Sequence, residues 1–349
     1  MWKVVLLGLA VFVFTACGAH TDMQTDNEGE EYIVTNATPL PDAPAAPAEL
    51  PQSDPVPAPM PATIPVAEIR DKPAWEDVTS FVCHYGAFTE MAGLFDVAIL
   101  EPRNVTRAQL AWLRERGTFT IGYISVGEDT ELRRMDGQGP GGYASFYIDD
   151  GEGQPARNNN WNSYFVDAGN GVWQQMVIGR AGELLAMGFD GIFLDTIDTA
   201  EIFPDTRPGM AELIRRLREH FPEAKIVANR GFFMLEDFAP YISGIMFEAF
   251  TGGYNFPLGE YTVHTGGDLA WTTARADEIN RVREDFYFPV FALDYADPED
   301  IETIQMLYDR AWEYDFLPSV SVIMLNRVFW REISPQTQRG VRSGLSRWE

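Results

Sequence analysis

The sequence is poor in basic residues, and this scarcity restricts the partners that it can have. Its 349 residues include 26 Lys and Arg against 52 Asp and Glu, which gives a formal net charge of −26 at pH 7. Nucleic-acid binding requires a basic surface that neutralises phosphates, so the composition argues against a nucleic-acid partner. The excess of acid suits a cationic partner, or simply keeps the protein soluble.

Cysteine and histidine are also scarce, which argues against several kinds of site. Two cysteines give no disulfide framework, and Cys83 lies in an apolar segment where we expect a small buried side chain. The four histidines contain no short-spaced pair of the kind that binds zinc, and no Gly-x-Ser-x-Gly stretch supports a serine triad. Oxygen ligands could hold Mg²⁺ or Ca²⁺. We predict no metal and no cofactor, which leaves acid–base chemistry by carboxylates.

The N-terminal apolar run is too short to span a membrane as a mature helix, and we interpret residues 1–17 as a signal peptide. Lys3 precedes the apolar residues 4–14, and residues 14–17 read Phe-Thr-Ala-Cys, which resembles a bacterial lipobox. The pattern predicts lipidation of Cys17 and a lipoprotein anchored in the bacterial cell envelope. Gly18 after Cys17 favours the outer membrane where the envelope has one. An uncleaved anchor or a plain secretory signal, which would give a secreted protein, is the alternative.

Residues 18–73 have the composition of a disordered linker. Their first part is acidic, and residues 39–65 contain ten of the 23 prolines, interleaved with alanine. Proline fixes φ and removes a hydrogen-bond donor, so we expect an extended, semi-rigid tether. The tether would hold a single folded domain, residues 74–349, away from the membrane.

Eight short apolar runs follow, and each ends in polar residues. Near-continuous runs of this kind predict parallel strands that are covered on both faces. The runs are residues 81–85, 97–101, 119–124, 191–195, 226–229, 244–248, 290–294 and 320–325.

Helical patterns lie between several of these runs. They predict a helix capped at Asn104 or Thr106 and stopping at Gly117, helices over 173–185 and 210–221, and a helix over 301–312 capped by Asp297-Pro298. Strands alternating with helices over about 270 residues predict one (β/α)₈ TIM barrel, with segment 129–170 as an elaborated loop over its mouth. A doubly wound sheet is the alternative, but no glycine-rich phosphate loop follows the first run.

Polar residues end these runs, and in a barrel such ends converge on the face that carries active sites. Acids crowded together must be protonated, paired or bound to a ligand. Among them, Asp195 and Glu248 follow alternate strands and could flank a glycosidic bond, as two carboxyl groups do in glycoside hydrolases. Ordinary loop polarity is the alternative. The residues concerned are Tyr85, Glu101, Glu128, Asp195, Asn229, Glu248, Asp294 and Tyr295.

Four stretches together resemble one family of enzymes. They are DGIFLDTIDT at 190–199, GYISVGE at 122–128, ANRG at 228–231 and Phe247-Glu248. They resemble the endo-α-1,4-polygalactosaminidases of glycoside hydrolase family 114 and its relatives, over about residues 75–330. The resemblance implies a (β/α)₈ barrel that cleaves α-1,4-linked galactosamine polymers with endo action and retention of configuration. The acid-rich composition suits a partly deacetylated, cationic amino sugar polymer.

The resemblance also implies roles for individual residues. Asp195 would be the nucleophile and Glu248 the general acid/base. Glu101 matches the pattern less well than the other strand ends. The sugar subsites would be lined by Tyr85, Glu128, Asp198, Asn229, Asp294 and Tyr295.

Two other functions stay open at this point. A chitinase-like, substrate-assisted hydrolase would carry Asp-x-Asp-x-Glu, but residues 195–199 lack the final glutamate. A lipoprotein that binds polysaccharide without cutting it would also suit the tether and the aromatic loops. Aromatic residues near the strand ends could stack on sugar rings, although Phe250 and Trp271 suit ordinary core packing equally well; the set is Tyr85, Phe250, Tyr254, Trp271 and Tyr295.

Overall fold

Eight short parallel strands form the centre of the structure, a computed structural model that we describe for residues 23–25, 31–33 and 67–329. Each strand pairs with the next one along the chain, and the last lies against the first. This is the predicted (β/α)₈ barrel, because a doubly wound sheet would reverse its strand order. The strands are β3 Phe81–His84, β4 Val97–Leu100, β5 Phe119–Ser125, β9 Gly191–Asp195, β10 Lys225–Asn229, β11 Gly244–Glu248, β14 Val290–Tyr295 and β15 Leu317–Ser321.

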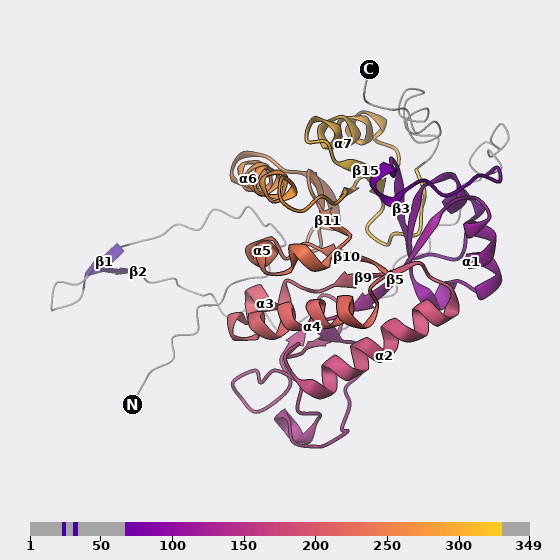
Figure 1. Cartoon of the computed structure of the whole chain (residues 1–349). Helices are drawn as coiled ribbons and strands as arrows, with labels where there is room; N and C mark the ends of the chain where they lie inside the picture. Colours follow the sequence, from indigo (N-terminus) through magenta and orange to yellow (C-terminus); the bar gives the residue numbers. More distant parts are fainter. Residues whose placement is uncertain (1–22, 26–30, 34–66, 330–349) are drawn as a thin grey trace, which may run out of the picture. The chain divides into compact units, whose positions relative to one another are not determined.

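Helices surround these strands on the outside (Figure 1). The α-helices are α1 Arg107–Arg114, α2 Gly171–Met187, α3 Thr199–Ile202, α4 Arg207–His220, α5 Leu235–Phe238, α6 Gly266–Arg283 and α7 Ile301–Glu313. Short 3₁₀ turns supplement them at Trp75–Asp77, Glu90–Leu94, Pro102–Asn104, Pro140–Gly142, Pro204–Thr206, Phe232–Met234 and Ala239–Tyr241.

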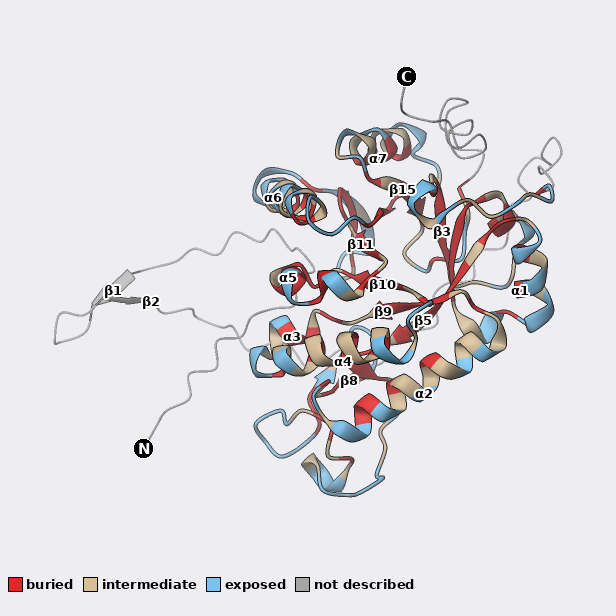
Figure 2. Ribbon diagram, viewed as in Figure 1, coloured by how far each residue is buried: buried red, intermediate tan, exposed pale blue. Residues whose placement is uncertain are grey.

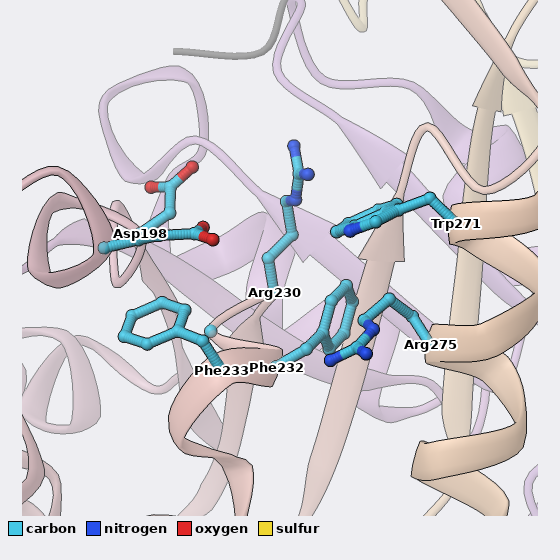
Figure 3. Close-up of a pocket in the computed structure, with 8 residues that line it drawn as sticks. Asp198, Arg230, Phe232, Phe233, Trp271 and Arg275 are labelled. Carbon is cyan, nitrogen blue, oxygen red and sulfur yellow. The ribbon is translucent and has the colours of Figure 1, made fainter. Parts of the chain in front are cut away.

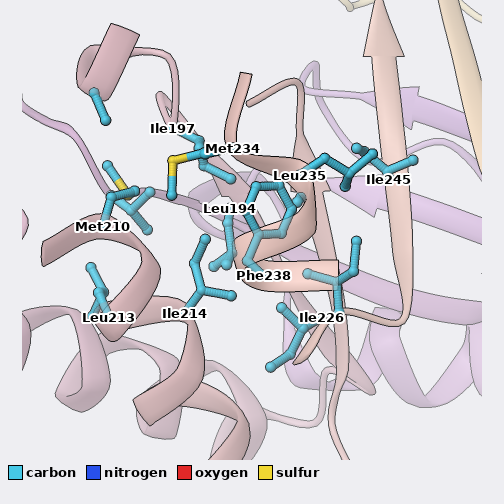
Figure 4. Packing of buried hydrophobic residues seen from close by; sticks show 14 of the residues in the cluster. Leu194, Ile197, Met210, Leu213, Ile214, Ile226, Met234, Leu235, Phe238 and Ile245 are labelled. Atoms are coloured by element: carbon cyan, nitrogen blue, oxygen red, sulfur yellow. The ribbon is translucent and has the colours of Figure 1, made fainter. Parts of the chain in front are cut away.

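Side chains that alternate in direction along the strands form two hydrophobic cores, one inside the barrel and one between the strands and the helices. Side chains of successive strand residues point to opposite faces, so odd and even positions enter different layers. In β9, Phe193 belongs to the cluster inside the barrel, whereas Ile192 and Leu194 pack outward against the helices. Figure 4 shows this outer layer, with Leu194 facing Ile214 of α4 and Phe238 of α5. The strands are accordingly buried on both sides, and the helices expose only their outer faces (Figure 2).

Most predicted helices begin where the sequence indicated. Thr106 and Gln109 form a reciprocal capping box at the start of α1, as expected for one of the two proposed caps. The cap of α7 was wrongly assigned to Asp297, because the side chain of Asp300 accepts the hydrogen bond from the backbone N–H of Thr303. The helix itself was still predicted at the right place, because Ile304, Leu307 and Tyr308 form its buried face.

Several elements differ from the prediction. The eighth strand is β15, which begins three residues before the predicted run because its proline and serine do not look apolar. Helix α6 was not predicted, since its sequence is polar on nearly every side. The insertion 129–170 contains strands β7 Arg157–Asn158 and β8 Ser163–Phe165, which form a small antiparallel sheet with β6 Glu128–Asp129. A further hairpin, β12 Gly252–Asn255 with β13 Glu260–Val263, follows β11.

The barrel's contacts begin before the predicted boundary at residue 74. Ala67 is buried, the Arg70 guanidinium lies 2.5 Å from a carboxylate oxygen of Asp96, and the Lys72 ammonium lies 2.6 Å from Asp190. These ion pairs hold residues 70–72 against the N-terminal ends of β4 and β9. Residues 67–73, assigned to the linker by the prediction, therefore pack against the barrel.

The predicted signal peptide and Cys17 lie outside the described residues. Within the predicted linker, β1 Met23–Thr25 pairs antiparallel with β2 Glu31–Ile33. In the part of the chain that the structure describes, every helix is too short or too polar to cross a membrane.

Candidate active site

The alternation that builds the barrel also places a layer of polar side chains at its mouth. Each of these residues lies two positions after a member of the inner hydrophobic cluster and therefore points inward at the carboxyl end of its strand. The layer comprises Tyr85, Tyr123, Asp195, Asn229, Glu248 and Tyr295, which follow Cys83, Ile121, Phe193, Val227, Met246 and Leu293.

A single side-chain amide connects the two candidate catalytic carboxylates. The Nδ2 nitrogen of Asn229 donates to Oδ1 of Asp195 at 2.8 Å and to Oε2 of Glu248 at 2.7 Å. These two bond lengths set an upper limit of 5.5 Å on the separation of the bonded oxygens, because both oxygens contact the same nitrogen. The predicted acid pair thus meets across one narrow gap, with Asp195 and Glu248 partly exposed and Asn229 buried.

Two tyrosines complete the hydrogen bonding of the pair. The hydroxyl of Tyr123 donates to Oδ2 of Asp195 at 2.9 Å, and the hydroxyl of Tyr295 donates to Oε1 of Glu248 at 2.6 Å. Burial raises the pKa of Tyr123 and Tyr295 far above the usual value, and the adjacent carboxylates raise it further. Both phenols therefore keep their protons and act as fixed donors to the two acids.

The electrostatics of the site oppose the ionisation of Asp195. Burial and then the neighbouring Glu248 carboxylate raise the pKa of Asp195 to about 6, although the bonds from Asn229 and Tyr123 oppose the shift. Asp195 therefore keeps its proton to a higher pH than an exposed aspartate does, because the neighbouring carboxylate opposes its ionisation.

The chain turns sharply after each of the three central residues. Thr196, Arg230 and Ala249 directly follow Asp195, Asn229 and Glu248, and they have positive φ of 66°, 56° and 52°. Non-glycine residues rarely adopt this conformation, and a β-branched threonine least of all. The Oγ1 of Thr196 accepts a bond from the backbone N–H of Gly127, which fixes this turn against the end of β5. The strain is thus concentrated where three strands present their functional side chains.

Asp294, predicted to line the sugar subsites, does not lie in the mouth. Asp294 is one of the β14 residues whose side chains point out of the barrel, and it is only 1% exposed. Its carboxylate accepts hydrogen bonds from the backbone N–H groups of Thr251 and Gly252 at 2.6 and 2.8 Å. Burial raises its pKa to about 7. Its place in the alternation makes Asp294 an anchor for the loop after β11, whereas the next residue, Tyr295, points into the site.

Removal of this anchor should reduce stability rather than substrate affinity. Asp294→Ala leaves two buried N–H groups unpaired, and we expect a loss of about 2–4 kcal/mol in the free energy of unfolding, measured by denaturant titration. Asp297→Ala, at an exposed aspartate of the next loop, is the matched control. A stable Asp294→Ala protein with a raised KM would instead make Asp294 a sugar ligand.

Glu128 and Glu101 lie at the rim and are engaged by the protein. Glu128 is 8% exposed and accepts bonds from Ser163 and, at 3.0 Å, from Asn158, so it holds the insertion sheet beside the mouth. Burial raises its pKa, and the Asp195 charge adds to the shift. Glu101 pairs with the exposed Arg103 at 2.8 Å. Both glutamates add negative charge to the rim.

Tyr85 and Asp198 remain available at the site. The Tyr85 ring lies edge-on to the ring of Tyr123, 5.3 Å between centroids, and so borders the Asp195 side of the gap. Asp198 begins α3 without capping it, and its pKa is raised by burial while the nearby Arg230 opposes the shift. Both residues were predicted to contact sugar, and both have the position for it.

Aromatic residues from two loops that follow barrel strands contact each other. Trp161, in the turn between β7 and β8 and 55% exposed, contacts Phe256 of the β12–β13 hairpin, with ring centroids 5.3 Å apart. Phe256 also contacts Tyr254, one of the predicted stacking residues. Phe250 lies in the outer core and is fully buried, which agrees with its alternative interpretation.

No group of three or more His, Cys, Asp or Glu side chains is arranged to hold a metal ion among the described residues.

Comparison with protein families agrees with this geometry. A family model described as glycoside-hydrolase family GH114 matches residues 65–331, most of the chain. The chain belongs to glycoside hydrolase family 114. The sequence resemblance, the barrel and the prediction of a glycoside hydrolase are thereby confirmed.

Solved structures resemble this family 114 chain over almost their full length. The glycoside hydrolase domain of PelA from Pseudomonas aeruginosa is 25% identical with a TM-score of 0.60, and the match covers 72% of this chain and 97% of that domain. A glutamate-to-alanine variant of the same domain gives 25% and 0.61 with the same coverage. Ega3 from Aspergillus fumigatus, solved with galactosamine, shares the fold at 12% identity and a TM-score of 0.53, covering 74% of this chain and 96% of Ega3. No curated protein matches significantly.

Tyr123 belongs to the candidate site but was not among the residues predicted from the sequence. It lies within β5, two residues before the strand ends, and not at the end of an apolar run. The alternation of side-chain direction along the strand could have identified it. Tyr123 lies two residues after the inward-facing Ile121, so its side chain also points into the barrel. Position relative to the inner core is a better guide to this site than position at the end of a strand.

Proposed function

We propose that the protein is a retaining endo-hydrolase of α-1,4-linked galactosamine polymers, with Asp195 as nucleophile and Glu248 as general acid/base. One observation carries the proposal: the Asn229 amide bonds both acids and keeps their bonded oxygens within 5.5 Å. Retaining enzymes separate their carboxyl groups by about 5–5.5 Å, whereas inverting enzymes need roughly 6.5–9.5 Å to admit a water.

The reaction is a double displacement. Asp195 attacks the anomeric carbon while Glu248 gives its proton to the departing glycosidic oxygen, which leaves a sugar covalently bound to Asp195. Glu248, now ionised, takes a proton from a water that attacks the same carbon and releases Asp195. The pair begins and ends with one proton. Tyr123 and Asn229 stabilise the Asp195 carboxylate when it leaves.

Charge supports an amino sugar polymer as the substrate. Asp195, Asp198, Glu248, Glu128 and Glu101 surround the mouth of a protein with net charge −26, a field that attracts a polymer of free amines. Ega3, which has the same fold, was solved with galactosamine. We assign Tyr85, Asp198, Asn229 and Tyr295 to the subsites next to the cleaved bond, and Glu128 to the support of the loop above it.

Product analysis tests this function directly. Purified enzyme should release new reducing ends from α-1,4-galactosamine polymer, shorten the chains from within, and give α-configured ends in an NMR time course. Absence of new ends with retained binding would support a polysaccharide-binding lipoprotein instead. A requirement for full N-acetylation at the cleaved sugar would support the substrate-assisted alternative.

The fall of kcat/KM at low pH, the acidic limb of the pH profile, should follow the protonation of Asp195. Because its pKa is about 6 and the nucleophile must be ionised, kcat/KM should fall about tenfold per pH unit below pH 6. Tyr123→Phe removes a donor to the carboxylate, which favours protonation and should move this limb to higher pH. Tyr254→Phe, in the β12–β13 hairpin, should leave the limb in place. An unchanged limb in Tyr123→Phe would mean that another group controls it.

For the N-terminus we propose attachment through a lipid on Cys17, supported by the lipobox-like residues 14–17. Expression in a bacterial host with labelled palmitate should label the full-length protein and place it in the membrane fraction. Cys17→Ser should lose the label. Unlabelled protein in the medium would favour the plain secretory signal.

A further inference from the structure

An asparagine-rich turn in the insertion carries an exposed tryptophan. Residues 158–163 read Asn-Asn-Asn-Trp-Asn-Ser and connect β7 to β8. Trp161 is 55% exposed, whereas Trp173 is fully buried in the outer core. Asn159 and Asn160, just before Trp161, are exposed as well. The turn therefore presents one flat aromatic ring among side-chain amides that can donate and accept hydrogen bonds.

The protein holds this turn from two sides. Asn158 and Ser163, which close the turn, both donate to the carboxylate of Glu128, the first at 3.0 Å. Glu128 lies in β6, shortly after the end of β5, and is 8% exposed. The Trp161 ring is held from the other side by the Phe256 ring, at 5.3 Å between centroids and with nearly perpendicular planes (85°). A ring fixed in this way loses little conformational entropy when it binds a ligand.

The turn lies on the face of the barrel that carries the acid pair. The insertion follows β5 and the hairpin with Phe256 follows β11, so both leave the carboxyl ends of barrel strands. In the sheet, β9 and β10 lie between these two strands. Asp198 and Arg230, which follow β9 and β10, line one hollow of this face (Figure 3). A polymer that is cut at Asp195 thus extends over the face on which Trp161 is exposed.

The chemistry of the turn matches a sugar ring. The C–H groups on one face of a galactosamine ring carry partial positive charge, and the electron-rich face of an indole attracts them. Sugar hydroxyls donate and accept hydrogen bonds, as the amides of Asn159 and Asn160 do. Packing between two loops would by itself favour a buried ring, but more than half of Trp161 remains exposed.

We propose that the turn of residues 158–163 is a sugar-binding subsite outside the catalytic gap, with Trp161 as its stacking surface and Asn159 and Asn160 as ligands of sugar hydroxyls. Phe256 acts through Trp161, as a positioning residue. The proposal rests on the proposed function and adds to it a preference for long chains, because only a chain that extends beyond the cleaved unit contacts Trp161.

Binding of chains of graded length tests the proposal. We would measure the affinity of the Glu248→Gln protein for α-1,4-galactosamine oligosaccharides of increasing length by calorimetry, and we expect the affinity to rise with length. Adding Trp161→Ala should weaken binding of the long chains about 3- to 10-fold, the range for one aromatic contact, and should change binding of the shortest chains far less. Trp161→Tyr keeps an aromatic ring and should retain most of the rise.

Controls separate the subsite from a structural role of the turn. Tyr287→Ala removes a 67% exposed aromatic ring just before β14, at the opposite end of the barrel, and should leave the affinities at all lengths unchanged. Phe256→Ala should weaken binding of the long chains in the same direction as Trp161→Ala. An equal loss at every chain length in Trp161→Ala, or no loss at any length, would overturn the proposal.

Rate measurements keep the subsite separate from the proposed reaction. In the otherwise wild-type protein, Trp161→Ala should raise KM for the long polymer more than KM for an aryl galactosaminide. If no polymer is cut but the affinity rises with length and Trp161→Ala removes the rise, the proposed hydrolysis fails and the subsite stands. If polymer is cut and the affinity does not depend on length, the subsite fails alone. Absence of both cutting and binding would overturn both.

Discussion

Asp195→Asn and Glu248→Gln should each lower turnover on the polymer by about three to five orders of magnitude, the loss seen when one member of a cooperating catalytic set is removed. Both substitutions are nearly isosteric, and each keeps one acceptor oxygen while an NH2 group replaces the other. The fold should therefore survive, as circular dichroism would check. Asp205→Asn, at an exposed residue, is the matched control and should retain wild-type activity.

The two variants should differ with an activated substrate. An aryl galactosaminide needs little acid assistance, so Glu248→Gln should still form the covalent intermediate and hydrolyse it slowly. Mass spectrometry should then find one sugar attached to the peptide that contains Asp195. Asp195→Asn should show no adduct. An adduct on Glu248, or Asp195→Asn activity within tenfold of wild type, would reverse or remove the assigned roles.

Asp195→Asn should also stabilise the fold at neutral pH. The pKa of Asp195 is raised from 3.8 to about 6 on folding, so the folded state binds this proton more tightly than the unfolded state does. Ionisation of Asp195 therefore costs stability progressively as the pH rises from about 4 to 6, and the full penalty applies above pH 6. The gain in Tm should be larger at pH 7.5 than at pH 5. An equal gain at both values would point to packing instead.

Asn229→Ala should produce the second large effect, a loss of about 10²–10³-fold in kcat, as for the removal of one preorganised donor from an active site. The amide donates hydrogen bonds to both acids, and it opposes the rise in the pKa of Asp195. Without it, repulsion between the carboxylates increases and their spacing is no longer fixed. The acidic limb of the pH profile should move upward together with the loss in rate.

Asn229→Asp provides a stricter test of the same idea. The substitution preserves size but replaces a shared donor by a third carboxyl group, so we expect a loss at least as large as in Asn229→Ala. Asn158→Ala is the comparison, because its amide donates to Glu128 at the rim and not to the acid pair. It should lower the rate far less. Similar losses in Asn158→Ala and Asn229→Ala would show that the bridge between the acids has no special role.

Local pattern in the sequence determined the barrel and its acid pair. Each strand forms a continuous apolar run because both of its faces are covered, and the convergence of parallel strand ends brings Asp195 and Glu248 together across 53 positions of chain. Thr106 is a helix-start signal of the same local kind, because it caps the N-terminus of α1. The strand pattern and the helix cap depend on residues that are close in the chain. The meeting of the two acids follows from the convergence of parallel strand ends, which holds for every (β/α)₈ barrel.

Only the tertiary structure decided which polar residues face the gap and which serve the protein. Asp294 and Tyr295 are adjacent, yet the pleat of β14 buries the first under a loop and points the second at Glu248. Tyr123, hidden inside an apolar run, became a donor to Asp195, and Asn229 became the link between both acids. The role of such a side chain depends on strand phase and on distances to partners from remote segments, which a list of strand ends does not contain.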